Sequence, residues 1–202
     1  MYERNEGELG KAGEMMPPLL SVVTRCYKSP ETLRVNIMSV ACQTSDDWEH
    51  VFIVDEEGIG LLLANQSLYL NRHRVKGDYI LILDDDDCLA YDEFVEDLKD
   101  IALDWGPDII MIKMDQKLRI LPDAVVWEKR PVFGHIGSCC FVVRREIWQE
   151  HIELFGQPNG GDFSFISALF ARAESSGWRV YWFDKVCTKI QRVGYGKSAE
   201  EW

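Results

Sequence analysis

The sequence lacks the features that distinguish exported, membrane-spanning and nucleic-acid-binding proteins. Its 202 residues hold 22 Lys and Arg against 34 Asp and Glu, and the net charge of -12 disfavours nucleic acid or an anionic lipid surface as the main partner. Its longest nearly apolar stretch, 131–143, falls short of the roughly 20 residues that a transmembrane helix needs. Residues 1–14 contain no apolar core of a secretory signal. These absences predict a soluble, cytoplasmic protein with no transmembrane segment and no nucleic-acid partner.

Metal-binding and redox patterns built from cysteine and histidine are also missing. The six cysteines form no CxxC pair, and the four histidines lack the spacing of zinc ligands, so we expect reduced thiols and no zinc site. No repeat, low-complexity segment or linker divides the chain. Its length therefore favours one domain, expected over 17–190, with flexible tails at 1–16 and 191–202.

The first part of the chain alternates between strand and helix patterns. A short β-branched apolar run at 19–24 suits a buried strand, and Ser29 and Pro30 then suit the start of a helix whose apolar face would hold Leu33, Ile37, Val40 and Ala41. Further strands are expected at 50–54 and 79–83, with a helix at 61–73 between them. Three strands separated by helices within about 65 residues predict an α/β fold with a mainly parallel sheet flanked by helices.

The remainder continues this alternation. We expect helices at 91–103 and 162–176, the second ended by Gly177, and strands at 108–114, 118–121, 139–143 and 179–183.

Polar clusters follow each of the first three strands, at 24–28, 55–58 and 84–87. Ligands of parallel α/β sheets bind beyond the carboxyl ends of the strands, so these clusters predict one shared binding site.

The third cluster consists of four consecutive aspartates, 84–87, directly after a buried strand. Residues 84–100 hold nine Asp and Glu against one basic residue, Lys99. Adjacent carboxylates repel one another unless a cation neutralises them, and hard oxygen donors suit Mg²⁺ or Mn²⁺. The alternative is a solvated acidic loop. A calcium EF-hand is excluded because its spaced ligands and glycine are absent.

Four ordered blocks carry a resemblance to a known family: SVVTRCY (21–27), SVACQT (39–44), FIVDEEG (52–58) and KGDYILILDDDD (76–87). Together they resemble the family 2 glycosyltransferases of the GT-A fold over about residues 19–90, with weaker similarity to about residue 190. The resemblance implies a single Rossmann-like GT-A domain with a mainly parallel central sheet. It also implies inverting, metal-dependent transfer of a sugar from a nucleotide-diphosphate sugar, foremost a UDP-sugar, to a hydroxyl of a glycan, a lipid-linked molecule or another acceptor.

The resemblance also implies roles for residues at the first two strand ends. Arg25 and Tyr27 after the first strand, and Asp55 and Glu56 after the second, match the positions that hold the donor's base and ribose. An aromatic ring can stack on a base, and a carboxylate can accept hydrogen bonds from a base or ribose. The alternative is that Tyr27 and Asp55 only pack or cap near helix starts.

The aspartate run matches the family's DXD motif. By this match Asp84 and Asp85 contact the donor and Asp86 coordinates Mn²⁺ or Mg²⁺, which would bridge the two phosphates and stabilise the leaving group. Asp87 matches an extra acid of the family whose role could be confined to hydrogen bonds within the loop.

Inverting transfer also needs a carboxylate that takes the proton from the attacking hydroxyl. The resemblance assigns this role to Asp162, which follows Gly160 and Gly161 at the start of the last helix. Asp162 could instead be an N-terminal helix cap, and the two roles are compatible. By the resemblance, His135 and the segment 134–140 match part of the sugar and acceptor pocket, and Trp127 could stack on a sugar or fill the core.

Several positions depart from the family pattern. Glu56 replaces an aspartate, and Leu68 stands where spacing would put a donor-binding arginine, for which Asn65, Arg72 and Arg74 are candidate substitutes.

Residues 191–195 lack the QxxRW motif of processive synthases, which favours transfer of a single sugar. A non-catalytic nucleotide-sugar-binding protein or a subunit of a glycosyltransferase complex is the main alternative function. A nucleotidyltransferase is disfavoured because no glycine-rich loop follows the first strand. Both a monomer and a homo-oligomer stay open.

Overall fold

The computed structural model describes residues 16–58, 60–157 and 160–191, which form one mixed α/β domain. The strands are β1 (Leu20–Cys26), β2 (Trp48–Val54), β3 (Tyr79–Ile82), β4 (Asp87–Leu89), β5 (Ile109–Asp115), β6 (Ile120–Leu121), β7 (Phe141–Arg144) and β8 (Val180–Ile190). The α-helices are α1 (Pro30–Ala41), α2 (Leu61–Leu70), α3 (Phe94–Asp104), α4 (Arg145–His151) and α5 (Gly161–Ser176). The 3₁₀ turns are η1 (Arg72–Arg74), η2 (Ser138–Cys140) and η3 (Ile152–Gly156).

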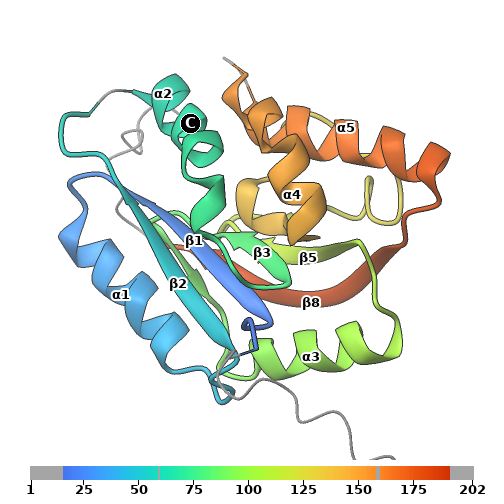
Figure 1. Cartoon of the computed structure of the whole chain (residues 1–202), viewed down its shortest axis with the longest axis horizontal. Helices are drawn as coiled ribbons and strands as arrows, with labels where there is room; N and C mark the ends of the chain where they lie inside the picture. The colour runs from blue at the N-terminus through green and yellow to red at the C-terminus, as the bar shows by residue number, and fades with distance from the viewer. Residues whose placement is uncertain (1–15, 59, 158–159, 192–202) are drawn as a thin grey trace, which may run out of the picture.

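A single sheet lies between two layers of helices (Figure 1). Helices α1 and α3 cover one face, and α2, α4 and α5 cover the other. The strand order is β2-β1-β3-β7-β5-β8-β4, with β6 beside β5. All four residues of β3 are buried, as expected for a central strand covered on both faces.

The sheet is mixed, so the predicted mainly parallel arrangement is not confirmed. Strand β1 pairs in parallel with β2 and β3, and β5 pairs in parallel with β8. Strand β7, however, runs antiparallel to both β3 and β5, and β4 runs antiparallel to β8. A buried strand is continuously apolar in either direction, so the pattern of residues 141–144 carries no information about its direction.

Helix α1 buries a different face from the predicted one. Its buried residues are Thr32, Asn36 and Val40, whereas Ile37 is 38% exposed. The helix packs beside β4 and the turn that follows β3, where backbone carbonyls need hydrogen-bond donors. A polar residue at the centre of this face is therefore favourable, and the apolar periodicity was misleading.

The predicted tails lie outside the described residues, except for Met16 and Gln191. Within the described ranges, no helix combines the length and the apolar character needed to cross a membrane.

Candidate functional site

The first three strand ends lie side by side at one edge of the sheet. The Asp55 amide donates to the Cys26 carbonyl at 2.9 Å, which joins the ends of β2 and β1. The Asp85 amide donates to the Arg25 carbonyl at 3.3 Å, which joins the turn after β3 to β1. The three polar clusters of the sequence therefore border one another.

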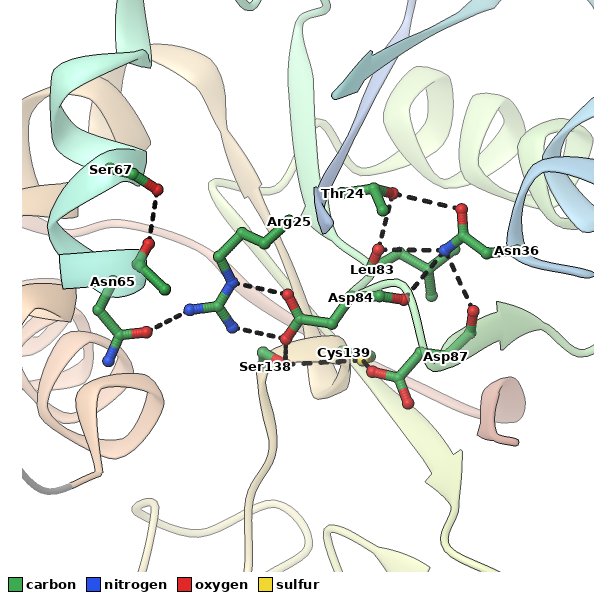
Figure 2. Close-up of polar contacts among 11 residues, drawn as sticks. Thr24, Arg25, Asn36, Asn65, Ser67, Leu83, Asp84, Asp87, Ser138 and Cys139 are labelled. Carbon is green, nitrogen blue, oxygen red and sulfur yellow. Dashed lines mark hydrogen bonds and ion pairs between the residues drawn. The ribbon is translucent and has the colours of Figure 1, made fainter. Parts of the chain in front are cut away.

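Arg25 and Asp84 form a two-pronged ion pair at the centre of this edge (Figure 2). Arg25 Nε and Nη2 lie 2.7 and 2.5 Å from the two carboxylate oxygens of Asp84. Nη1 donates to the side-chain oxygen of Asn65 in α2, and the guanidinium lies 5.6 Å from the Phe155 ring centre. The Arg25 and Asp84 side chains are 14% and 20% exposed. Such a largely buried pair is costly to break by removing one partner.

Asp85 links the turn at residues 83–87, called the aspartate turn below, to the segment after β1. Its Oδ2 accepts hydrogen bonds from the Tyr27 amide at 2.8 Å and from Ser29 Oγ at 2.7 Å. Burial raises the pKa of Asp85, although these hydrogen bonds act in the opposite direction. Its predicted contact with a donor would have to coexist with this structural role.

Asp86 has a different environment from its neighbours. Its half-buried carboxylate makes no hydrogen bond or ion pair with another side chain in the part of the chain that the structure describes. Burial, followed by the negative charges of Asp84 and Asp85, raises the pKa of Asp86 to about 6. A cation would favour the ionised form. Asp86 is therefore the member of the run best suited to bind one.

Asp87 points into the protein. It is buried, and its carboxylate accepts a hydrogen bond from Cys139 Sγ at 2.7 Å. Burial, with the charges of Asp86 and Asp84, raises the pKa of Asp87 well above its ordinary value. This side chain belongs to the support of the turn and does not face a ligand.

The carboxylates of the aspartate run suit a cation that is bound together with phosphate. Among residues 16–58, 60–157 and 160–191, no group of three or more His, Cys, Asp and Glu side chains could hold a metal ion. Mg²⁺ and Mn²⁺ commonly use one or two carboxylates and take their remaining ligands from water and phosphate. Asp86 alone suits that mode of binding, in which the ion arrives with a phosphorylated ligand.

Tyr27 and the loop after β2 lie against each other. Gly58 has φ +76°, and a Cβ atom at this position would lie 2.1 Å from the Tyr27 hydroxyl oxygen, so only glycine allows this contact. Asp55 Oδ1 accepts hydrogen bonds from the amides of Glu57 at 3.1 Å and Gly58 at 2.8 Å. Asp55 therefore caps the turn that follows β2, while Glu56 is exposed.

Asp162 lies in the first turn of α5, and Gly160 is the N-cap. The alternative that Asp162 is the N-cap is therefore wrong. Its Oδ1 accepts a hydrogen bond from the Phe163 amide at 2.8 Å. Burial is the main cause that raises its pKa; Arg25 opposes this rise and Asp84 adds to it. These electrostatic effects show that Asp162 lies near the Arg25–Asp84 pair.

The structure separates the candidate substitutes for the missing arginine. Leu68 is fully buried. Arg72 donates to the Tyr69 carbonyl and Arg74 to the Phe52 carbonyl, so both are engaged by backbone. Asn65 alone of the three contacts the cluster, through Arg25.

The acceptor-side candidates, Trp127 and His135, each contact other side chains of the protein. Trp127 packs edge-on against Trp182, with ring centres 4.9 Å apart, and Lys113 Nζ lies 4.5 Å from the Trp127 ring centre. His135 Nδ1 lies 2.6 Å from Asp123 Oδ2. Trp127 is half-buried and packs against Trp182 and Lys113.

Sequence reasoning missed three residues that support the aspartate turn: Asn36, Ser138 and Cys139. Asn36 Nδ2 lies within hydrogen-bond distance of three carbonyl oxygens at the turn, and Ser138 Oγ lies 3.4 Å from Asp84 Oδ2. A signal for Asn36 exists in the spacing of Thr32, Asn36 and Val40, which share one helix face. Ser138 and Cys139 come from a distant segment and give no local signal.

Protonation of His50 makes the free energy of unfolding depend on pH. Its Nε2 lies 2.7 Å from Thr24 Oγ1, and burial lowers the pKa of His50 from 6.5 to about 4. The unfolded chain therefore takes up a proton near pH 6.5 and the folded chain only near pH 4. Stability from this group is complete above pH 6.5 and is lost as the pH falls towards 4, by about 3 kcal/mol.

We accordingly expect the His50→Gln variant to lose less free energy of unfolding than the wild type between pH 7 and 4.5, measured by urea denaturation. Equal losses in the two proteins would contradict this assignment.

Comparisons with known proteins give matches only at the level of structure. No family model matches the sequence, and no curated protein does. S. aureus TarS 1-349 in complex with UDP-GlcNAc matches with TM-score 0.64 and 17% identity, over 89% of this chain and 60% of that chain. The mannosyltransferase PcManGT from Pyrobaculum calidifontis, in complex with GDP-Man and Mn²⁺, matches with TM-score 0.61 and 15% identity, over 89% of this chain and 59% of that chain. A197 from STIV matches with TM-score 0.51 and 15% identity, over 82% of this chain and 81% of that chain.

This chain spans 36% of one matched TarS chain and 60% of each TarS 1-349 chain. At these identities the likeness establishes the fold alone. The chain therefore shares the α/β fold of structures that include a mannosyltransferase and a UDP-GlcNAc complex.

Proposed function

We propose that the chain is an inverting, metal-dependent glycosyltransferase that moves a single sugar from a nucleotide-diphosphate sugar to an acceptor hydroxyl. The observation that carries the proposal is the half-buried Asp86 carboxylate, which pairs with no other side chain among the described residues and lies beside the buried Arg25–Asp84 ion pair. The order of the sequence blocks supports a family 2 enzyme. The names of the matched structures support a nucleotide sugar as the ligand.

In this proposal the cluster binds the donor from three sides. Tyr27, Asp55 and Glu56 hold the base and ribose. The Arg25–Asp84 ion pair orients the diphosphate end of the donor. Asp86 would hold Mn²⁺ or Mg²⁺ together with the phosphate oxygens, and the ion would supply Lewis-acid stabilisation of the departing nucleoside diphosphate. Asp85 keeps the turn attached to Tyr27 and Ser29.

Asp162 would act as the general base. A buried carboxylate with a raised pKa accepts a proton more readily than an exposed one, and its proximity to Arg25 favours the ionised form before the reaction. The acceptor class stays open among glycans, lipid-linked molecules and other hydroxyl compounds. An enzyme of this kind needs a general base, whereas a non-catalytic nucleotide-sugar-binding protein does not.

A thermal-shift panel tests the donor and the metal together. The panel contains UDP, GDP, CDP and ADP, each with Mn²⁺ or with EDTA. We expect one or two of these nucleotides to raise the melting temperature and the others to leave it unchanged. A ligand at 100 times its Kd adds about 2.7 kcal/mol, which corresponds to roughly 5–10 °C for a chain of this size. No shift with any of these nucleotides in Mn²⁺ would refute the proposed function.

A further inference from the structure

Asn36 in α1 makes an unusual set of contacts with the aspartate turn. Its side chain is fully buried, and its Nδ2 lies 3.2 Å from the Leu83 carbonyl oxygen, 3.0 Å from that of Asp84 and 3.1 Å from that of Asp87. Figure 2 shows these three contacts converging on one amide. Thr24 Oγ1 lies 3.4 Å from Asn36 Oδ1, which orients the amide with its nitrogen towards the turn.

These contacts bring a further hydrogen-bond donor to each of three carbonyls of the turn. A carbonyl oxygen has two lone pairs, and burial removes the water that would otherwise bond to them. The Asp84 carbonyl also accepts the Asp87 amide at 2.9 Å, and the Leu83 carbonyl also accepts Thr24 Oγ1 at 2.8 Å. One amide therefore links the start of the turn to its end.

The opposite side of the turn is held by Gln191, the residue that follows β8. The Gln191 amide donates to the Asp86 carbonyl at 2.8 Å, and Gln191 Nε2 donates to the carbonyls of Thr32 and Asp87. The backbone around Asp86 is thus fixed by α1 and by the residue that follows β8. Because the Asp86 side chain pairs with no other side chain in the described part of the chain, this backbone sets where its carboxylate lies.

We propose that Asn36 is a positioning residue for the metal-binding turn. Its amide holds residues 83–87 in the shape that presents the Asp86 carboxylate to a divalent cation and a diphosphate. The inference rests on the proposed function, because it assigns Asn36 a part in metal-dependent nucleotide binding. Aspartate, although it has the same shape, would bring acceptors instead of donors to the three carbonyls, and a further negative charge to the run.

The test uses three variants and one matched control. Asn36→Ala removes the amide, Asn36→Asp keeps the shape but removes the donors, and Asn36→Ser keeps one small donor in case the others do not fold. Val40→Ala is the control, because Val40 is buried on the same face of α1 one turn further on and has no polar side-chain atom.

The readout is the metal increment, which is the Kd for UDP or GDP in EDTA divided by the Kd in Mn²⁺, measured by calorimetry well below the melting temperature. We expect the metal increment of each folded Asn36 variant to be at least about tenfold smaller than that of the wild type. The affinity in EDTA should change less than about twofold. Val40→Ala should retain the wild-type increment. A wild-type increment in the Asn36 variants, or an equal loss in Val40→Ala, would overturn the proposal.

A second readout separates failure of this inference from failure of the proposed function. If the wild type binds UDP and GDP no more tightly with Mn²⁺ than with EDTA, the metal-dependent function fails. The positioning role is then judged by hydrogen exchange of the Asp85 and Asp87 amides, which donate to Arg25 and Asp84 carbonyls. Exchange should be at least about tenfold faster in the Asn36 variants and unchanged in Val40→Ala; wild-type exchange in the Asn36 variants would refute the role.

Discussion

Replacing Asp86 with alanine is expected to abolish the gain in nucleotide affinity that Mn²⁺ confers, a loss of about 100-fold or about 2.7 kcal/mol. Asp84 is occupied by Arg25, Asp85 by Tyr27 and Ser29, and Asp87 by Cys139. None of these carboxylates can replace Asp86 without giving up its present partners. Calorimetry with UDP or GDP, in Mn²⁺ and in EDTA, measures the loss.

The control for Asp86→Ala is Asp100→Ala. Asp100 is exposed on α3, so its removal changes the net charge by the same amount away from the turn. We also expect Asp86→Ala to unfold at a higher temperature than the wild type in EDTA, since it removes one of several adjacent negative charges. A variant that retains the Mn²⁺ effect would exclude Asp86 as the ligand.

Replacing Asp162 with asparagine is expected to lower the rate of sugar transfer by about 10²–10⁴-fold while donor affinity changes less than about threefold. Asparagine fills the same space in the first turn of α5 but cannot accept the proton of an attacking hydroxyl. The rate is measured as release of UDP or GDP from the nucleotide sugar that stabilises the protein, with water as the acceptor where no other is known.

Glu146→Gln is the matched control for Asp162→Asn. Glu146 is also an acid in the first turn of a helix, α4, and its side chain is 65% exposed. It reproduces the loss of a negative charge at a helix N-terminus without touching the cluster. Normal turnover by Asp162→Asn would remove Asp162 as the base. Binding of the nucleotide sugar by the wild type with no turnover would instead favour the non-catalytic alternative.

The sequence predicted the elements near the site well because their patterns are local. The apolar runs of β1, β2 and β3 and the Ser29–Pro30 helix start depend on neighbouring residues in the chain. The direction of β7 depends on how a distant segment enters the sheet, and no local pattern encodes it. Helix α4 has seven residues, which is too short for a clear periodicity.

Strand β8 shows how an irregularity limits such predictions. A strand was expected at 179–183, but β8 continues to Ile190. Asp184 and Lys185 interrupt its apolar pattern, and the register with β5 shifts near Lys113. A β-bulge of this kind changes the alternation of side chains, so the strand seemed to end where its pattern changed.

The sequence predicted the charged residues of the candidate site but not the contacts that hold them in place. The aspartate run and the strand-end clusters were visible because acidic residues after a buried strand are locally conspicuous. The Arg25–Asp84 pairing depends on the register of β1 and β3, and the Asn36 contacts depend on how α1 packs. Both are tertiary features that follow only once the sheet is assembled.

The most direct test of the central claim is a calorimetric titration of the unmodified protein with UDP and with GDP, each in Mn²⁺ and in EDTA. The proposed site requires at least one of them to bind, and to bind at least about tenfold more tightly with Mn²⁺. Equal affinity with and without the metal, or no binding of either nucleotide, would contradict it.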